Sequence, residues 1–131
     1  MNKRFQDKVA VVTGAAQGIG RRVAERLLEE GAQVLAVDRS ELVFELAECE
    51  AVLCLTADLE QAGDCQRVMQ AAVERFGRLD ILINNVGGTI WAKPFEHYET
   101  AQIEAEVRRS LFPTLWCCHA ALPQMLAQGS G

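Results

Sequence analysis

The residues best suited to chemistry in this chain form a glycine-rich turn near the N-terminus. Three glycines follow an apolar run and precede a helical pattern. Glycines let backbone N–H groups approach a pyrophosphate, and the N-terminus of the next helix favours its negative charge. A plain tight turn also uses glycine, but the strand–turn–helix context favours a dinucleotide site. We therefore predict that a cofactor is bound by Gly14, Gln17, Gly18, Ile19 and Gly20.

An acidic residue lies where such a site needs one. Asp38 ends the second apolar run, twenty residues after Gly18, and a carboxylate there accepts hydrogen bonds from ribose hydroxyls. The same charge would repel a 2′-phosphate by about 4 kcal/mol at 4 Å and an effective dielectric constant of 20, which predicts NAD rather than NADP. We expect Arg39 to lie over the adenine or in solvent, although it could hold a phosphate. A helix-capping role is the alternative for Asp38.

Apolar runs alternate with helical patterns along the chain, which predicts an α/β fold. The run over residues 9–13 lacks polar alternation, as expected of a strand buried on both faces of a parallel sheet. Ser40 is the expected N-cap of a short helix whose Leu42, Val43 and Leu46 face inward. Pro113 should kink or split the last helix. The expected strands are 9–13, 33–38, 51–56 and 79–84, and the expected helices are 18–30, 40–48, 60–76 and 97–127.

Composition narrows the class of protein. The 131 residues, half of them hydrophobic and 24% charged, are typical of one globular domain. The net charge of −5 and the lack of a basic stripe argue against nucleic-acid binding. The chain holds no apolar stretch long enough to span a membrane, and no apolar segment follows the charged residues at its start before Asp7 and Lys8, so we expect no secretory signal. Five cysteines without a C-x-x-C spacing indicate a reducing compartment, so we expect a cytoplasmic protein, and we expect no metal site.

Three motifs together resemble the short-chain dehydrogenase/reductase family over essentially the whole chain. They are the Gly-x-x-x-Gly-x-Gly spacing of the turn, the Asp58-Leu59 pair after the third strand, and Asn84-Asn85-Val86-Gly87 after the fourth. The resemblance implies a Rossmann-type doubly wound parallel sheet with strand order 3-2-1-4. It implies that Asp58 bonds the adenine amino group beside Leu59 and that Asn84 supports the sheet. It also implies that the cofactor is lined by Asn85, Val86 and Gly87.

Further stretches resemble a narrower group, the bacterial cis-diol dehydrogenases that act on a dihydroxycyclohexadiene carboxylate. These stretches are residues 3–5, 20–27, 37–42 and 108–116. The resemblance implies transfer of a hydride from this small-molecule substrate to NAD, followed by loss of carbon dioxide to give a catechol. It also implies a homo-oligomer.

The chain departs from the family in length. Family members are about twice as long, near the 250 residues of one large α/β domain, so residues 1–131 are expected to form the N-terminal dinucleotide-binding half, incomplete at the C-terminus. The family's catalytic serine lies on the next strand, and its tyrosine and lysine, four residues apart, lie on the next helix. Tyr98, the one tyrosine here, has no lysine four residues on. We therefore expect the segment alone to be inactive.

A second departure is Ser110, which stands where the family usually has an asparagine that orders a water. Ser110 could still hold a water, and helix packing is the alternative. Arg108 or Arg109 could approach a substrate carboxylate, although solvated arginines are the default. Trp91 is expected to form a substrate wall, whereas His97 is expected to be structural.

Two other functions stay open. One is a non-catalytic nucleotide-binding or interaction module. The other is an NADPH-linked ketoreductase of the same family. A continuation of the reading frame that contains Ser and then Tyr-x-x-x-Lys would favour an enzyme.

Overall fold

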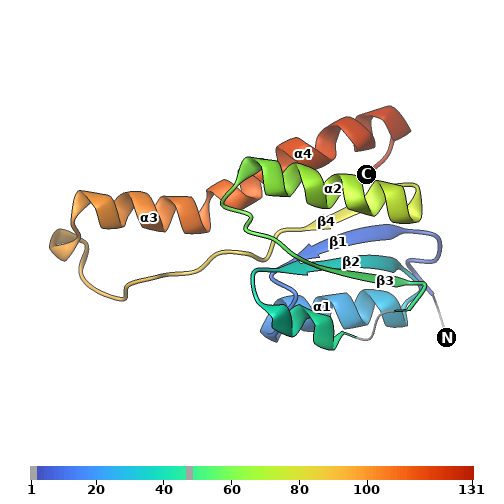
Figure 1. Ribbon diagram of the computed structural model, residues 1–131, viewed down its shortest axis with the longest axis horizontal. Helices are drawn as coiled ribbons and strands as arrows, with labels where there is room; N and C mark the ends of the chain where they lie inside the picture. Colours follow the sequence, from blue (N-terminus) through green and yellow to red (C-terminus); the bar gives the residue numbers. More distant parts are fainter. Residues whose placement is uncertain (1–2, 47–48) are drawn as a thin grey trace.

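The computed structural model describes residues 3–46 and 49–131, and its centre is a four-stranded parallel sheet. Every pairing in the sheet is parallel, and the strand order is β3-β2-β1-β4 (Figure 1). This confirms the predicted α/β fold and strand order. The strands are β1 (Val9–Thr13), β2 (Gln33–Asp38), β3 (Val52–Thr56) and β4 (Ile81–Ile83).

Helices cover both faces of the sheet. The helix α1 (Gly18–Glu29) lies on one face, and α2 (Ala62–Phe76) and α4 (Phe112–Gln128) lie together on the other (Figure 1). Successive β1 side chains alternate between two cores, with Val12 on the α1 side and Val11 on the α2 side. All five β1 residues are buried. The apolar run of β1 is explained by this arrangement, since both faces of a parallel sheet are covered and side chains on either face are buried.

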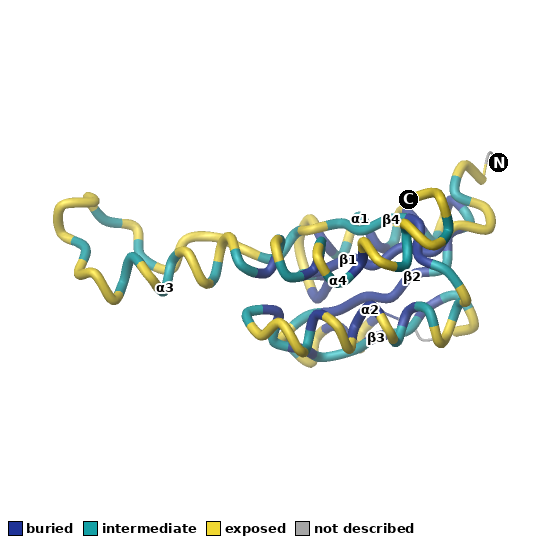
Figure 2. Tube along the Cα trace, turned by 90° about the horizontal axis from the view of Figure 1, so that it is seen from above, coloured by how far each residue is buried: buried dark blue, intermediate teal, exposed yellow. Residues whose placement is uncertain are grey.

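A long arm extends from this body. It consists of the connection after β4, the short 3-10 helix η2 (Phe95–His97) and the helix α3 (Thr100–Ser110) (Figures 1 and 2). None of the described α3 residues is buried. The helical stretch is split at Leu111, and Pro113 occupies the first turn of α4. The predicted break is thus confirmed. Pro113 lies at the start of the second helix because a proline is tolerated in the first turn.

Two predicted elements differ in the structure. The segment after Ser40 forms a five-residue 3-10 helix, η1 (Glu41–Glu45), with Ser40 as the predicted N-cap. Its three-residue repeat places Val43 and Leu46 on the buried side and leaves Leu42 exposed, so the inward position predicted for Leu42 was wrong. The predicted end of this helix, at Glu48, lies outside the described residues.

The fourth strand is also shorter than the predicted 79–84. Leu79 is buried, but its backbone N–H and C=O both bond to the Gln128 side chain at 2.9 Å rather than to a strand. The α4 helix thereby ties its C-terminal end to the start of β4. Among the described residues, no helix is long and apolar enough to cross a membrane.

Candidate functional site

The glycine-rich turn joins β1 to α1, and its glycines serve different purposes. A Cβ atom on Gly20 would lie 2.1 Å from the Gly14 carbonyl oxygen, so only glycine fits where α1 packs against the turn. A Cβ atom on Gly18 would have no other atom within 4 Å, and Gly18 has a left-handed φ of +62°. Gly20 therefore closes the turn, whereas Gly18 leaves open space at the N-terminus of α1. That open space fits an approaching pyrophosphate.

A buried threonine ties this turn to the end of β4. The Thr13 hydroxyl accepts hydrogen bonds from the Asn85 and Val86 amides at 2.9 and 3.2 Å and donates to the Ile83 carbonyl at 3.2 Å. The Asn85 side-chain amide donates to the Gly14 carbonyl at 3.2 Å. Sequence reasoning assigned no role to Thr13. The available signal was a hydroxyl at the end of an otherwise apolar strand.

Asp38 faces the same turn from the end of β2. Its two carboxylate oxygens accept hydrogen bonds from the Ala16 amide at 3.1 Å and the Ser40 amide at 2.9 Å. The cap of η1 is Ser40, whose hydroxyl accepts from the Leu42 amide, so the capping alternative for Asp38 was wrong. A carboxylate has about four acceptor positions. Asp38 thus keeps the capacity to accept hydrogen bonds from ribose hydroxyls.

A cleft of about 210 Å³ opens at the carboxyl ends of the strands. Most of the residues predicted to bind cofactor share it, although they come from four separate segments of the chain. Gly18, Ile19 and Gly20 are not part of the lining, and the lining adds three residues that sequence reasoning did not assign to the cofactor: Ala57, Glu60 and Arg109. The full lining is Gly14, Gln17, Asp38, Arg39, Ala57, Asp58, Leu59, Glu60, Asn85, Val86, Gly87 and Arg109.

The wall formed after β3 is held by local hydrogen bonds. The Asp58 amide donates to the Asp64 carboxylate at 2.8 Å, and the Asp58 carboxylate accepts from the Glu60 amide at 3.1 Å. Leu59 is buried beneath. The Arg39 guanidinium is 3.8 Å from the Glu60 carboxylate, so this ion pair joins the ends of β2 and β3.

Ser110 lies outside the cleft. Its hydroxyl donates to the Gly88 carbonyl at 2.9 Å, which holds the segment after β4 against the end of α3. The neighbouring arginines differ. Arg109 lines the cleft, whereas the Arg108 guanidinium lies 5.7 Å from the centre of the Phe112 ring. The structure thus separates two residues that sequence reasoning treated alike.

The outer end of the arm is organised by Glu106. Its carboxylate accepts hydrogen bonds from the Trp91 amide at 2.9 Å and the Ile90 amide at 3.0 Å. These amides, the Trp91 amide above all, lower the pKa of Glu106. The Tyr98 hydroxyl donates to the Trp91 carbonyl at 2.5 Å, and burial, followed by the nearby Glu106 charge, raises the Tyr98 pKa.

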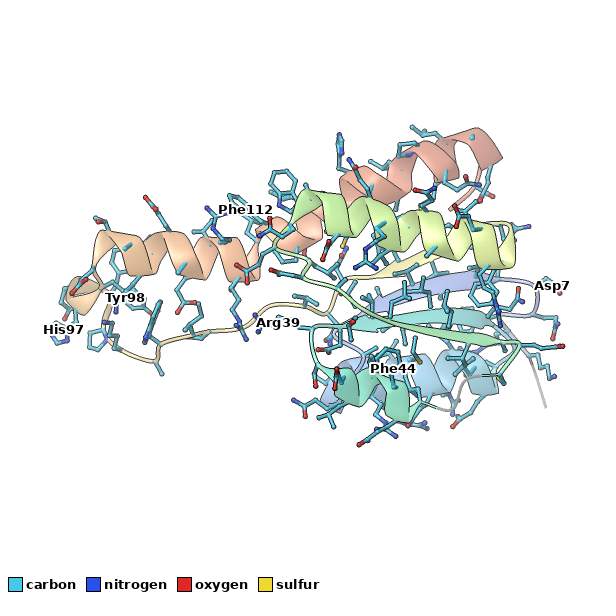
Figure 3. All side chains as sticks on the ribbon, in the orientation of Figure 1. Asp7, Arg39, Phe44, His97, Tyr98 and Phe112 are labelled. Atoms are coloured by element: carbon cyan, nitrogen blue, oxygen red, sulfur yellow. The ribbon has the colours of Figure 1, made fainter. Side chains whose placement is uncertain are left out.

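These contacts make Tyr98 a structural residue. Figure 3 shows Tyr98 and His97 at the outer end of the arm, away from Arg39. Neither residue lines the cleft, and Trp91 does not line it either. The structure therefore does not bring Trp91 and Ser110 together with the predicted cofactor residues.

The chain matches known proteins along its whole length. The family model described as short chain dehydrogenase matches residues 8–131. The 1,6-dihydroxycyclohexa-2,4-diene-1-carboxylate dehydrogenase of Pseudomonas putida is 76% identical over 100% of this chain and 50% of its own length. The enzyme of that name from Acinetobacter baylyi is 48% identical over 98% of this chain and 51% of its own length.

A solved structure supports the fold. The 3-ketoacyl-(acyl-carrier-protein) reductase of Brucella melitensis, complexed with NADH, has a TM-score of 0.88 and 29% identity, covering 96% of this chain and 55% of its own. The present chain spans about half the length of the curated relatives it matches.

Proposed function

Because this chain belongs to the short-chain dehydrogenase family, we propose that it is the cofactor-binding half of an NAD-dependent oxidoreductase. The proposed substrate is a cis-dihydroxycyclohexadiene carboxylate. The observation that carries this proposal is the 76% identity to a dehydrogenase named for such a substrate. The proposed domain is residues 1–131, the N-terminal half of a single dehydrogenase domain.

The geometry of the cleft supports NAD as the cofactor. Gly18 leaves space for a pyrophosphate at the N-terminus of α1. Asp38 presents a carboxylate that the turn holds in place through the Ala16 amide. This carboxylate would accept bonds from the ribose hydroxyls and repel a 2′-phosphate. When bound, NAD supplies the acceptor for the hydride that leaves the diol carbon.

This segment contributes binding and orientation to the proposed reaction. Asp58 and Leu59 form one wall for the adenine, and Thr13 fixes Asn85, Val86 and Gly87 at the other end of the site through two amide hydrogen bonds. The family resemblance implies that a Tyr-x-x-x-Lys pair, which residues 1–131 do not contain, would take the proton from the substrate hydroxyl. Loss of carboxylate as carbon dioxide then restores an aromatic ring as a catechol.

The surface of α4 fits the proposed homo-oligomer. Leu111 and Leu115 are 48% and 47% exposed, and Leu122 and Leu126 are exposed further along α4. Burial of such side chains stabilises an assembly. We place the protein in the cytoplasm, because reducing compartments suit cysteines that form no disulfide within the described part of the chain.

The proposed function is tested by following absorbance at the NADH band. The longest natural form of the protein is mixed with NAD and the diol carboxylate, and the released carbon dioxide is measured in parallel. We expect one carbon dioxide for each NADH formed. Ketone reduction with NADPH, without diol oxidation, would favour the ketoreductase alternative. Nucleotide binding without turnover of either substrate would favour a binding module. Either result would overturn the proposal.

A further inference from the structure

Arg109 is a cation on the wall of the cleft, and its charge helps to lower the pKa of Glu106 on the same helix. Within the part of the chain that the structure describes, its guanidinium makes no hydrogen bond, ion pair or ring contact. The other arginines each have a carboxylate, a carbonyl oxygen or an aromatic ring as a partner. Arg39, for example, pairs with Glu60, and Arg108 lies over Phe112. An unpaired cation on the wall of a cleft is available to a ligand.

The acids around Arg109 are already engaged. The Asp38 carboxylate holds the Ala16 and Ser40 amides, and Glu60 pairs with Arg39. Glu106, one turn before Arg109 on α3, accepts hydrogen bonds from the loop amides at the outer end of the arm. Glu106 attracts Arg109 electrostatically, but within the described residues no hydrogen bond or ion pair engages the Arg109 guanidinium, so its planar face is open to a ligand.

The position of Arg109 in the cleft indicates which part of the cofactor it would contact. The cleft it lines also includes Asp38, Asp58 and Leu59, the residues assigned to the ribose and adenine. Pyrophosphate has its own cradle at the glycine turn, and the Asp38 charge disfavours a second phosphate. Ala57 and Leu59 contribute apolar atoms to this part of the lining.

We propose that Arg109 covers the adenine ring of the cofactor from the α3 side. A guanidinium is planar, stays charged and stacks on ring faces more readily than the ammonium of lysine. In this arrangement α3 contributes directly to cofactor affinity, although sequence reasoning placed the cofactor contacts only at the ends of the strands. The inference rests on the proposed function, because it assumes that the cleft binds a nicotinamide dinucleotide.

The test measures ligand binding by calorimetry in the longest natural form of the protein. The ligands are NAD, AMP and adenosine, and the variants are Arg109→Gln, Arg109→Lys and Arg108→Gln. We expect Arg109→Gln to weaken all three ligands by about 5- to 30-fold. Arg109→Lys should bind the three ligands nearly as weakly as Arg109→Gln does, because it keeps the charge but loses the planar group. Arg108→Gln removes the same charge one residue away and should change affinity less than twofold.

Three results would overturn the inference while leaving the proposed function intact. The first is unchanged AMP affinity in Arg109→Gln together with a raised KM for the diol carboxylate, which would make Arg109 a substrate contact. The second is weakened AMP binding with unchanged adenosine binding, which would make it a phosphate contact. The third is an Arg109→Lys variant that binds NAD, AMP and adenosine as tightly as the unmutated protein. Failure of the unmutated protein to bind NAD would overturn the proposed function and the inference with it.

Discussion

Substituting alanine for Gly20 or for Gly18 separates the two purposes of the glycine-rich turn. In Gly20→Ala the new Cβ atom would lie 2.1 Å from the Gly14 carbonyl oxygen and 2.5 Å from the Asn85 side-chain nitrogen. Attractive contacts between nonbonded atoms lie near roughly 3.5 Å, so α1 or the turn must shift by about 1 Å. In Gly18→Ala the Cβ atom would meet nothing within 4 Å.

The expected losses of stability differ accordingly. Overpacking a closely packed site costs about 1–3 kcal/mol. Because the clash at Gly20 involves a backbone oxygen, we expect Gly20→Ala to lose about 3 kcal/mol or more. In Gly18→Ala the only expected loss of stability comes from the left-handed φ of +62°, which costs about 1–2 kcal/mol for a residue other than glycine. Its methyl group would still enter the space left for the pyrophosphate, so we expect NAD affinity to fall about tenfold or more, equal to about 1.4 kcal/mol.

Urea unfolding and NAD titration of the longest natural form measure both effects. The unmutated protein and Gly63→Ala serve as controls, since a Cβ atom on Gly63 also meets nothing within 4 Å and Gly63 lies on α2 outside the cleft. A Gly20→Ala variant as stable as the unmutated protein would refute the packing argument. A Gly18→Ala variant that binds NAD normally would refute the pyrophosphate argument.

Four further outcomes are expected. Asp38→Ala should narrow the preference for NAD over NADP, measured as the ratio of the two dissociation constants, and an unchanged ratio would contradict the ribose role. Thr13→Val should lower the free energy of unfolding by about 1–3 kcal/mol, because buried amides lose their acceptor; a neutral effect in urea unfolding would contradict this. The pKa of Glu30 is lowered to about 2, chiefly by its hydrogen bond from Arg4. The charged Glu30 therefore stabilises the fold above its ordinary pKa, and this stabilisation is lost as the pH falls from about 4.5 towards 2. Over that pH range the urea midpoint should fall less in Arg4→Met than in the unmutated protein. Residues 1–131 expressed alone should show no dehydrogenase turnover, bind NAD weakly and self-associate, whereas a sharp monomer peak in size-exclusion chromatography with micromolar NAD binding would speak for a self-sufficient module.

The sequence by itself determined the first three strands, to within one residue, and the place of the glycine turn. The run over residues 9–13 predicts β1 with the observed bounds, because a parallel strand buried on both faces favours a continuous apolar run, which here ends at Thr13. The strand–helix alternation predicts the parallel sheet, since successive parallel strands need a crossover connection. These features depend on local composition and chain connectivity, both of which can be read along the sequence.

Only the tertiary structure decided which polar groups meet. Thr13 and Asn85 are 72 residues apart in the chain, yet their hydrogen bond joins the two turns of the site. Arg108 and Arg109 are equivalent as residue types. Arg108 meets Phe112, four residues on, but only the direction of α3 relative to the sheet brings Arg109 into the cleft. Leu42 was misplaced because a 3-10 helix rather than an α-helix formed there. Such outcomes depend on the register and packing of segments that are distant in sequence, and no local pattern records them.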